Sequence, residues 1–342
     1  MDKFGRFKNN ILNNYSKNII INISPSSSFR CRCEFSYSNN YYVMHDKDQK
    51  VFMDSFEYAS KAIQKKMPIL LKEINSSKKI KEKLFQINFR SNNKNEVLVT
   101  LIYHRKIDEF LINSISDLSN KIGIKIIIRS KNFIHAFDDH MFRDTLDYNN
   151  LRIYQTDNCF FQPNKYLLNK MINKVIDFVI NPEDLLELYC GVGTFTMPLS
   201  STFNKILATE NNRKADECLQ RGILENKINN IHTARLSSNE VIELFNGRTF
   251  RRMKDKSLLS YNFSHILVDP PRSGLTEELI ETINLFKNVI YISCNPNSYL
   301  RDINLLSGHN VKKIEIFDQF PNTEHLEICL LYTSPSPRDS GK

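Results

Sequence analysis

The chain has 342 residues, which is enough for two domains with separate cores. Apolar residues make up 41% of it and charged residues 25%, as in ordinary globular proteins. No apolar run approaches the roughly 20 residues of a membrane span, and no secretion signal follows Met1. We therefore expect a cytoplasmic protein without a membrane partner.

The net charge of +9 is unevenly distributed along the chain. Residues 1–150 contain 25 Lys and Arg against 16 Asp and Glu, so this part alone carries +9. Residues 151–342 contain 22 basic and 22 acidic residues and are neutral. A compositional bias towards lysine would raise both parts, so the asymmetry favours RNA or DNA as a partner of the first part.

The seven cysteines are scattered, and no two have the C-x-x-C spacing. Cys31 and Cys33 are separated by one residue, which suits neither a disulfide nor a zinc site. We therefore expect reduced thiols, with no metal and no iron–sulfur cluster.

The first part of the chain has the pattern of an α+β domain. Residues 7–21 show a loose helical periodicity. Alternating segments predict strands at 30–35, 84–89 and 96–104. Apolar spacing predicts helices at 56–74 and 107–122. The first of these is expected to break or kink just before Pro68. We expect antiparallel pairing of these strands and place this domain at 1–155.

From about residue 156 strands and helices alternate. Strands are predicted at 185–189, 206–210, 231–236, 265–269, 288–293, 311–317 and 325–331. Helices are predicted at 166–180, 195–201, 213–226, 237–246, 276–286 and 298–306. This order predicts a doubly wound, Rossmann-like α/β sheet of seven strands with an antiparallel strand at its edge, over 156–331. Residues 332–342 are rich in Ser and Pro, and we expect a disordered tail that is not native.

A glycine turn follows the first strand of this sheet. Gly191 and Gly193 let a ligand approach the backbone where the next helix begins. Glu210 ends the second strand, 17 residues after Gly193, where an acid can bond both hydroxyls of a ribose. Because Thr194 follows and no GxGxxG is present, the turn favours S-adenosylmethionine over a dinucleotide.

Three later motifs end at the same edge of the sheet. The C5 carbon of a uracil is too poor in electrons to accept a methyl group directly. A thiolate at Cys294 that adds to C6 makes C5 nucleophilic, and Glu327 is the candidate base for the C5 proton. Asp269 is placed to accept a hydrogen bond from an amine or a base edge, and Arg272 to clamp a carbonyl or a phosphate.

Two further residues are candidates outside these motifs. Gln162, at the domain junction, offers both a donor and an acceptor to a base or a cofactor. Phe85, in the basic part, is a candidate for stacking on an unpaired base.

Together the segments LLELYCGVGTF, LVDPPRSGL, YISCNP, FDQFPNTEHLE and FFQPN resemble the RNA uracil-5-methyltransferase family, above all its bacterial tRNA-modifying members. The resemblance extends from RCRCEF, DSF and KLFQINF in the N-terminal part to about Leu331. It implies methylation of C5 of the T-loop uridine of tRNA, at position 54, by S-adenosylmethionine to give ribothymidine. It also implies a monomer that binds the tRNA T-arm and T-loop-like RNAs such as tmRNA.

The resemblance assigns roles residue by residue. It implies that Cys294 is the nucleophile and Glu327 the proton acceptor, with Arg272 beside them. Cofactor contacts are implied at Gln162, Tyr189, Gly191, Gly193, Thr194, Glu210 and Asp269. Phe85 matches an aromatic residue that supports the rearranged T-loop. Two positions depart from the pattern: Thr194 replaces a usual Asn, and Gly222 replaces a common helix residue at a cost of about 1 kcal/mol.

Two other functions stay open from the sequence. The first is a uracil-5-methyltransferase of rRNA, whose family members often carry an N-terminal β-barrel and four cysteines for an iron–sulfur cluster. The second is an RNA-binding folding helper with weak or lost catalysis, which would bind tRNA without turnover.

Overall fold

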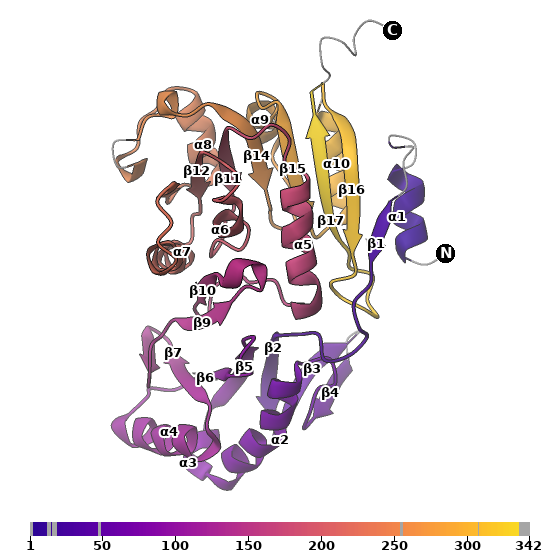
Figure 1. Cartoon of the computed structure of the whole chain (residues 1–342). Helices are drawn as coiled ribbons and strands as arrows, with labels where there is room; N and C mark the ends of the chain where they lie inside the picture. Colours follow the sequence, from indigo (N-terminus) through magenta and orange to yellow (C-terminus); the bar gives the residue numbers. More distant parts are fainter. Residues whose placement is uncertain are drawn as a thin grey trace, which may run out of the picture.

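The computed structural model describes residues 3–11, 15, 19–46, 49–253, 256–306 and 308–334. Two large sheets form the cores of two domains, which lie one above the other in Figure 1. Among the described helices, none has the length and apolar character needed to cross a membrane.

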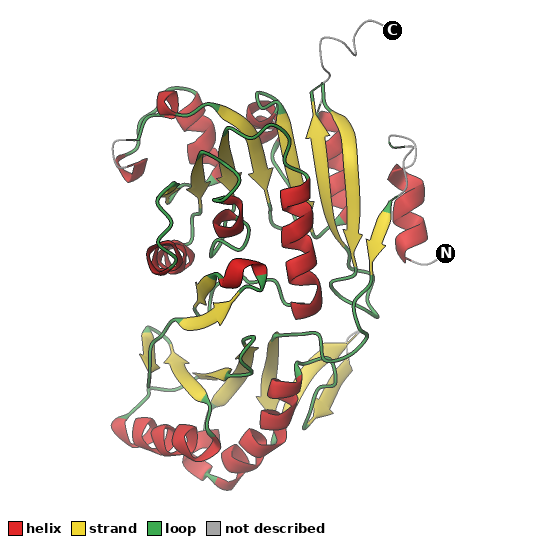
Figure 2. Ribbon diagram, viewed as in Figure 1, coloured by secondary structure: helices red, strands yellow, loops and turns green. Residues whose placement is uncertain are grey.

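The smaller domain is built on a seven-stranded sheet in the order β4-β3-β2-β5-β6-β7-β8. Its strands are β2 Arg32–Ser38, β3 Tyr41–Asp46, β4 Gln49–Met53, β5 Leu84–Ser91, β6 Val97–Tyr103, β7 Lys125–Ser130 and β8 Phe133–Ala136. Helices α2 Lys61–Ser76, α3 Lys78–Lys81 and α4 Glu109–Ile122 cover one face. The other face is turned towards the larger domain (Figure 2). All pairs are antiparallel except β6–β7, which α4 connects.

Helix α2 continues through Pro68, so the break expected there does not occur. The helix begins at Ser60, whose hydroxyl accepts a hydrogen bond from the backbone N of Ile63. Its inner side buries Ile63, Met67, Leu70, Leu71 and Ile74 against the sheet. Apolar burial on this side therefore outweighs the cost of a proline within the helix.

The larger domain contains an eight-stranded sheet in the order β1-β16-β17-β15-β14-β11-β12-β13. Its strands are β1 Ile20–Asn22, β11 Asp184–Leu188, β12 Lys205–Thr209, β13 Ile231–Ala234, β14 Phe263–Val268, β15 Asn288–Ser293, β16 Asn310–Phe317 and β17 Glu327–Thr333. On one face lie α5 Lys165–Asp177, α6 Thr196–Leu199 and α7 Arg213–Glu225. On the other lie α1 Lys3–Ile11, α8 Ser238–Phe245, α9 Glu277–Ile283 and α10 Pro296–Leu305.

The seven predicted strands of this sheet are present, but the reversed strand is not at the edge. Strand β17 pairs antiparallel with both β15 and β16, so it lies inside a mixed sheet. Helix α10 carries the chain past this position before β16 forms, and β17 then returns to fill the gap. The expectation of an antiparallel edge strand was wrong for this reason.

The N-terminal segment belongs to the larger sheet, whereas residues 1–155 were predicted to form one domain. Strand β1 pairs in parallel with β16, with Ile20 opposite Glu315. Helix α1 ends at Ile11 and Ile20 and Ile21 form β1, so the helix predicted over 7–21 is wrong at its end, while residues 12–14 and 16–18 lie outside the described residues. Buried Phe7 contacts Tyr299 of α10, and Lys3 Nζ lies 2.5 Å from Asp318 Oδ1. These contacts hold the segment on the larger domain.

The predicted end of the second domain at residue 331 is also wrong. Strand β17 includes Tyr332 and Thr333, which lie opposite Val289 and Asn288, so the expected tail does not begin at 332. Residues 335–342 of that expected tail lie outside the described residues.

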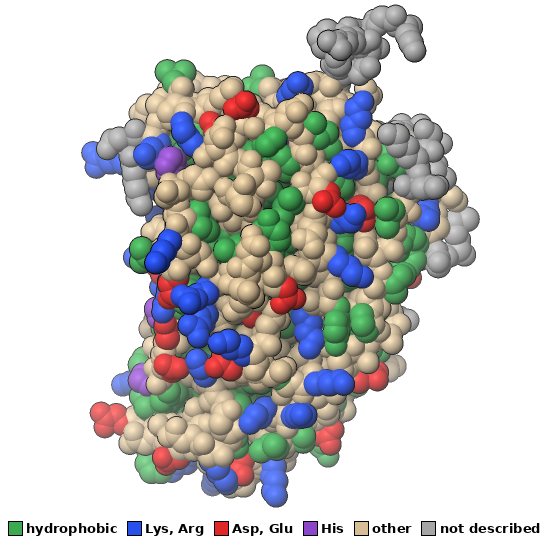
Figure 3. Space-filling model, in the orientation of Figure 1, with side chains coloured by type: hydrophobic (Ala, Val, Ile, Leu, Met, Phe, Trp, Pro, Cys, Tyr) green, Lys and Arg blue, Asp and Glu red, His purple; other side chains and the backbone are tan. Residues whose placement is uncertain are grey.

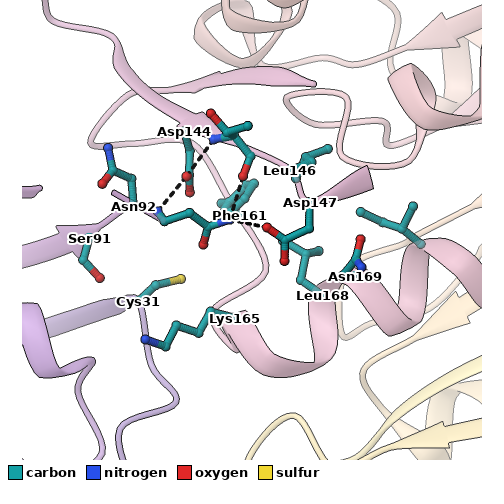
Figure 4. A pocket seen from close by; sticks show the side chains of 13 residues that line it. Cys31, Ser91, Asn92, Asp144, Leu146, Asp147, Phe161, Lys165, Leu168 and Asn169 are labelled. Atoms are coloured by element: carbon teal, nitrogen blue, oxygen red, sulfur yellow. Dashed lines mark hydrogen bonds between the residues drawn. The ribbon is translucent and has the colours of Figure 1, made fainter. Parts of the chain in front are cut away.

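A two-stranded sheet, β9 Phe142–Thr145 with β10 Arg152–Gln155, joins the domains, with the 3-10 turn η1 Tyr148–Asn150 between its strands. Two further 3-10 turns, η2 Arg251–Met253 and η3 Leu258–Ser260, precede β14. Beside β9 a cavity of about 20 Å³ lies between Cys31, Asp144 and Lys165 (Figure 4). It has room for about one water molecule and not for a substrate. Burial raises the pKa of Asp144 to about 6.

Candidate active site

The candidate residues of the larger domain gather at one edge of its sheet. Strands β11, β12, β14 and β15 run in parallel and end at this edge, and the reversed strand β17 begins there. The loops after the parallel strands carry the glycine turn, Glu210, Asp269 to Arg272, and Cys294. Ligands of α/β sheets bind at this edge, because there the loops and helix starts face a crevice.

Cys294 directly follows β15, and Glu327 is the first residue of the neighbouring strand β17. In the β15–β17 pair, Ser293 lies opposite Ile328, so the next residues in register are Cys294 and Glu327. Opposed residues of an antiparallel pair have Cα atoms about 5 Å apart. The Glu327 side chain is buried, whereas Cys294 is half-buried. The thiol therefore lies nearer the surface than the carboxyl group.

Five of the predicted residues influence one another electrostatically. Burial raises the pKa of Glu327 to about 7, and the Gln162 amide and the Arg272 guanidinium lower it. Burial and then the charge of Glu327 raise the pKa of Asp269. Burial also raises the pKa of Cys294 to about 11, with further increases from Glu327 and Asp269 and a decrease from Arg272. The fold thus brings these five side chains into one cluster.

The loop that carries Arg272 is fixed to helix α10. Asn295 Nδ2 donates to the Arg272 carbonyl oxygen at 2.8 Å. Arg301 Nη2 donates to the Leu275 carbonyl oxygen at 3.0 Å, and the Leu275 N donates to Asp302 Oδ2 at 2.9 Å. Asp302 itself is fully buried. Since α10 begins directly after Cys294, these bonds hold Arg272 next to the thiol.

The glycine turn adopts backbone conformations that favour glycine. Gly191 has φ +56° and faces open space, whereas a Cβ on Gly193, with φ +87°, would lie 2.3 Å from Leu219 Cδ1. Gly191 N donates to Glu210 Oε2 at 3.0 Å, and Asn212 N donates to Glu210 Oε1 at 2.7 Å. Each carboxylate oxygen keeps a second lone pair for a ligand hydroxyl.

Tyr189 and Thr194 flank this turn. Tyr189 also has a positive φ of 59°, and burial raises the pKa of its phenol, which the Ser238 side chain lowers. Thr194 is buried beneath the turn. The structure therefore places both residues beside the glycines, as the sequence predicts.

Gln162 has a buried amide that lies close to the Glu327 carboxyl group but makes no hydrogen bond of good geometry. Its side chain is 2% exposed, and neither Nε2 nor Oε1 has a hydrogen bond with the described residues. Buried amides without partners are rare in folded proteins, because desolvation is costly. The amide, the open space at Gly191 and the free lone pairs of Glu210 fit a cofactor of the nucleoside type. Among the described residues, no cluster of His, Cys, Asp and Glu could hold a metal ion.

Two residues of interest were missed by sequence analysis. Glu187 in β11 is 1% exposed, its Oε2 has no partner, and burial raises its pKa to about 8. It also raises the pKa of Asp269, so it belongs to the same cluster. The available signal was an acid inside the apolar run LLELY. His104 stacks on the exposed ring of Phe85, with centroids 4.0 Å apart.

Phe85 lies on the smaller sheet, apart from the cluster around Cys294. A pocket between the domains opens beside that cluster and includes Arg272. The smaller domain lines it with Arg30, Arg32, Cys33, Glu34, Phe35, Met44 and Phe56, and the larger domain with Phe160, Phe161, Pro163, Arg272 and Phe320. The pocket therefore lies between Arg272 and the part of the smaller domain that contains Arg30, Arg32 and Glu34.

The model of the tRNA (Uracil-5-)-methyltransferase family matches residues 1–334. The chain belongs to this family. A tRNA/tmRNA (uracil-C(5))-methyltransferase of Campylobacter lari is 40% identical over 324 residues, which cover 92% of each chain. The enzyme of the same name from Psychromonas ingrahamii is 38% identical over 319 residues, covering 89% of this chain and 87% of its own.

A solved structure has the same fold. The tRNA (uracil-54, C5)-methyltransferase of Pyrococcus abyssi, in complex with S-adenosyl-L-homocysteine, superposes with a TM-score of 0.76. It is 21% identical, and the match covers 97% of this chain and 83% of that chain. The predicted α/β methyltransferase fold is therefore confirmed for this family member.

Proposed function

We propose that this protein methylates C5 of uridine 54 in the T-loop of tRNA, with S-adenosylmethionine as the methyl donor, and that T-loop-like RNAs such as tmRNA are further substrates. Family membership and the names of the relatives support the reaction. The observation that carries the mechanism is that Cys294 and Glu327 follow the last pair of β15 and β17, Ser293 with Ile328, and influence each other electrostatically.

The residues around the glycine turn are suited to hold the cofactor. When bound, S-adenosylmethionine supplies a methyl group on a sulfonium. Glu210 accepts hydrogen bonds from the ribose hydroxyls, and the backbone of Gly191 lets the ligand approach closely. The buried amide of Gln162 and the carboxyl group of Asp269 bond the polar groups near the reacting centre.

The reaction uses a thiolate and a carboxylate in sequence. Burial holds Cys294 as a thiol at neutral pH, and Arg272 offsets part of this effect. Once the thiol has given its proton to a base, its sulfur forms a bond to C6 of the uracil while the C5–C6 π electrons move to C5 and O4. After C5 carries the methyl group, Glu327 takes the C5 proton. The electrons of the C5–H bond restore the C5–C6 double bond and expel the thiolate. A Glu327 pKa near 7 suits a base that works at neutral pH.

The smaller domain is the candidate RNA-binding domain. Lys and Arg side chains are spread over its surface (Figure 3), and residues 23–150 contain 21 Lys and Arg against 15 Asp and Glu, a net charge of +6. The T-loop uridine must leave its stack to reach Cys294, at a cost of a few kcal/mol. Phosphate contacts and stacking of a loop base on the exposed Phe85–His104 pair offset this cost.

The decisive experiment is mass spectrometry of nucleosides from unmodified tRNA incubated with protein and S-adenosylmethionine. We expect 5-methyluridine from the wild type and none from Cys294→Ala, which still binds tRNA. Cys218→Ala, which removes a buried thiol of α7, is the matched control and keeps activity. Methylation by Cys294→Ala would exclude the thiol mechanism, and a preference for rRNA transcripts would exclude tRNA as the substrate.

A further inference from the structure

We propose that Tyr41 and Phe52 form a second stacking site, which holds an unpaired nucleotide of the bound RNA beside the Phe85–His104 pair. This inference rests on the proposed function, because it presumes that the smaller domain binds tRNA. It adds a specific surface and a specific kind of contact: the face of a base against aromatic rings.

Both rings are exposed and touch each other. Tyr41 is 48% and Phe52 44% exposed, and their centroids lie 6.3 Å apart at an interplanar angle of 82°. Ser38 pairs with Tyr41, Ser36 with Val43, and Val43 with Phe52. Paired residues of neighbouring strands point to the same side of a sheet, and so do residues two apart. Tyr41 and Phe52 therefore share the face of Ser36 and Ser38.

That face is the one left uncovered by helices. On β2 the alternate residues Cys33 and Phe35 lie in the core formed with α2 and α4. The face of Ser36 is consequently the opposite one, which is turned towards the larger domain (Figure 1). An exposed aromatic pair in such a position does not contribute to the core of the domain.

The four rings lie on one face, separated by small side chains. Ser36 pairs with Gln86, and Gln86 pairs with Ile102, so this face continues across β5 and β6. His104, two residues after Ile102, continues the alternation and carries Phe85 stacked on it. Strand β2, with serines on this face, separates the two aromatic pairs.

The space between the pairs suits a base. Two strand spacings amount to about 9.6 Å. A base between two rings needs about 7 Å, which is two stacking steps of 3.4 Å. The serines of β2 are small enough to form the floor of such a slot.

The surrounding charges favour RNA over a protein partner. Lys50, Lys83 and Lys106 are exposed and lie within two residues of Phe52, Phe85 and His104 in the sequence. None of the three lysines has an ion pair within the described part of the chain. Lysine is depleted in protein–protein interfaces, whereas lysines around exposed rings are typical of surfaces that bind single-stranded RNA. The occupant that fits both features is a nucleotide whose base stacks and whose phosphate lies near a lysine.

The face of β2 that separates the two aromatic pairs also reaches the pocket beside the active site. Arg32 and Glu34 share the face of Ser36 and Ser38 on β2, and both line that pocket together with Arg272. The six residue steps from Arg32 to Ser38 span about 20 Å. The proposed slot is therefore within reach of nucleotides near the target uridine in the same RNA.

The test compares tRNA binding by full-length variants. We expect Tyr41→Ala combined with Phe52→Ala to raise the Kd for unmodified tRNA about tenfold, since a stacking contact is lost. The slope of log K against log salt stays unchanged, because no phosphate contact is removed. Lys50→Ala gives the opposite signature, a slope reduced by about 1. The combination of Tyr41→Phe with Phe52→Tyr keeps wild-type affinity.

The matched control is Phe133→Ala, which removes a ring 39% exposed on β8, at the other edge of the same sheet. It leaves the Kd unchanged. Wild-type affinity in the double alanine variant would overturn the proposal while Cys294-dependent methylation leaves the proposed function intact. The proposal would also be overturned if the double alanine variant had a lower Tm and the unfolded fraction of the protein accounted for the whole rise in Kd. Failure of the wild type to bind tRNA would overturn both the stacking site and the proposed function.

Discussion

The carboxyl groups of Glu187, Asp269 and Glu327 share one buried site, and burial raises the pKa of all three. Each also raises the pKa of a neighbour, since two negative charges in a low dielectric repel strongly. Such a cluster accepts a proton readily near neutral pH. The same property makes a base at Glu327 effective. It also makes ionisation of all three carboxyl groups at once costly.

Replacing the proposed base should trap the covalent intermediate. Glu327→Gln keeps the shape of the side chain but cannot remove the C5 proton, so Cys294 stays bonded to C6. We expect a protein–tRNA band of low mobility on a denaturing gel after incubation with S-adenosylmethionine. The double variant Cys294→Ala with Glu327→Gln should lack the band. Absence of the band in Glu327→Gln would exclude this residue as the base.

Glu187 should make stability depend on pH. Its pKa is about 8 in the folded protein and about 4.5 in the unfolded chain, so the unfolded chain loses its proton first as pH rises. The free energy of unfolding therefore falls between pH 4.5 and 8, by roughly 3 kcal/mol between pH 5 and 7.5. Glu187→Gln lacks this decrease. We expect similar Tm values near pH 5 and a higher Tm for Glu187→Gln at pH 7.5, measured by calorimetry; parallel pH profiles would contradict this.

The sequence located most of the site because its residues lie in motifs at strand ends. Cys294, Asp269 and Glu210 each follow an apolar run, and such positions meet at one edge of a parallel sheet. Glu187 lies inside a strand, where an acid has no recognisable spacing. His104 becomes visible only when β5 and β6 pair and bring it against Phe85.

At the scale of the elements, Gly222 in α7 has a packing reason. A Cβ there would lie 2.9 Å from Met197 Sδ and 3.4 Å from the Arg152 carbonyl oxygen. The glycine lets α7 approach α6 and β10 closely. The helix-propensity cost of about 1 kcal/mol expected from sequence is thus offset by contact between these elements.

A double-mutant cycle tests this explanation. Gly222→Ala alone should leave the Tm unchanged or lower, because the clash with Met197 cancels the gain in helix propensity. In a Met197→Ala background the same substitution should stabilise, by about 1 kcal/mol. Thermal unfolding of the four proteins measures the coupling. Equal effects in both backgrounds would show that Met197 does not restrict this position.

Sequence periodicity predicted where strands lie along the chain better than it predicted which strands pair in the sheet. The alternation of apolar strands and amphipathic helices gave the seven strands after residue 184 within a few residues. Pairing of β17 between β15 and β16 depends on chain crossing, which periodicity does not encode. Short strand β1 has only three residues, and the hairpin β3–β4 carries exposed residues on both faces, so neither has a strong apolar pattern.

At the scale of the whole molecule, the buried guanidinium of Arg90 ties the two domains together. It donates to Gln155 Oε1, to the Asp157 carbonyl oxygen at 3.1 Å and to the Cys159 carbonyl oxygen at 2.6 Å. These acceptors belong to the segment that leads to Gln162. The smaller sheet therefore positions a residue of the proposed cofactor site.

Arg90→Lys should accordingly weaken cofactor binding at a distance. Lysine keeps the charge but cannot bond three acceptors in a plane. We expect S-adenosylmethionine to bind about tenfold more weakly by calorimetry, with a Tm lower than that of the wild type. Arg105→Lys, which alters an ion pair with the exposed Glu82 after α3 in the same domain, should leave both unchanged. Wild-type cofactor affinity in Arg90→Lys would mean that the segment holds its conformation without the clamp.

The parallel pairing of β1 with β16 has a consequence for biosynthesis. Ile20 and its partner Glu315 are 295 positions apart, and at about 5–20 residues per second a ribosome needs roughly 15–60 s to make the intervening polypeptide. The smaller sheet, whose strands all lie between them, has time to fold first. The apolar Ile20 and Ile21 stay without their partner strand until β16 has been synthesised.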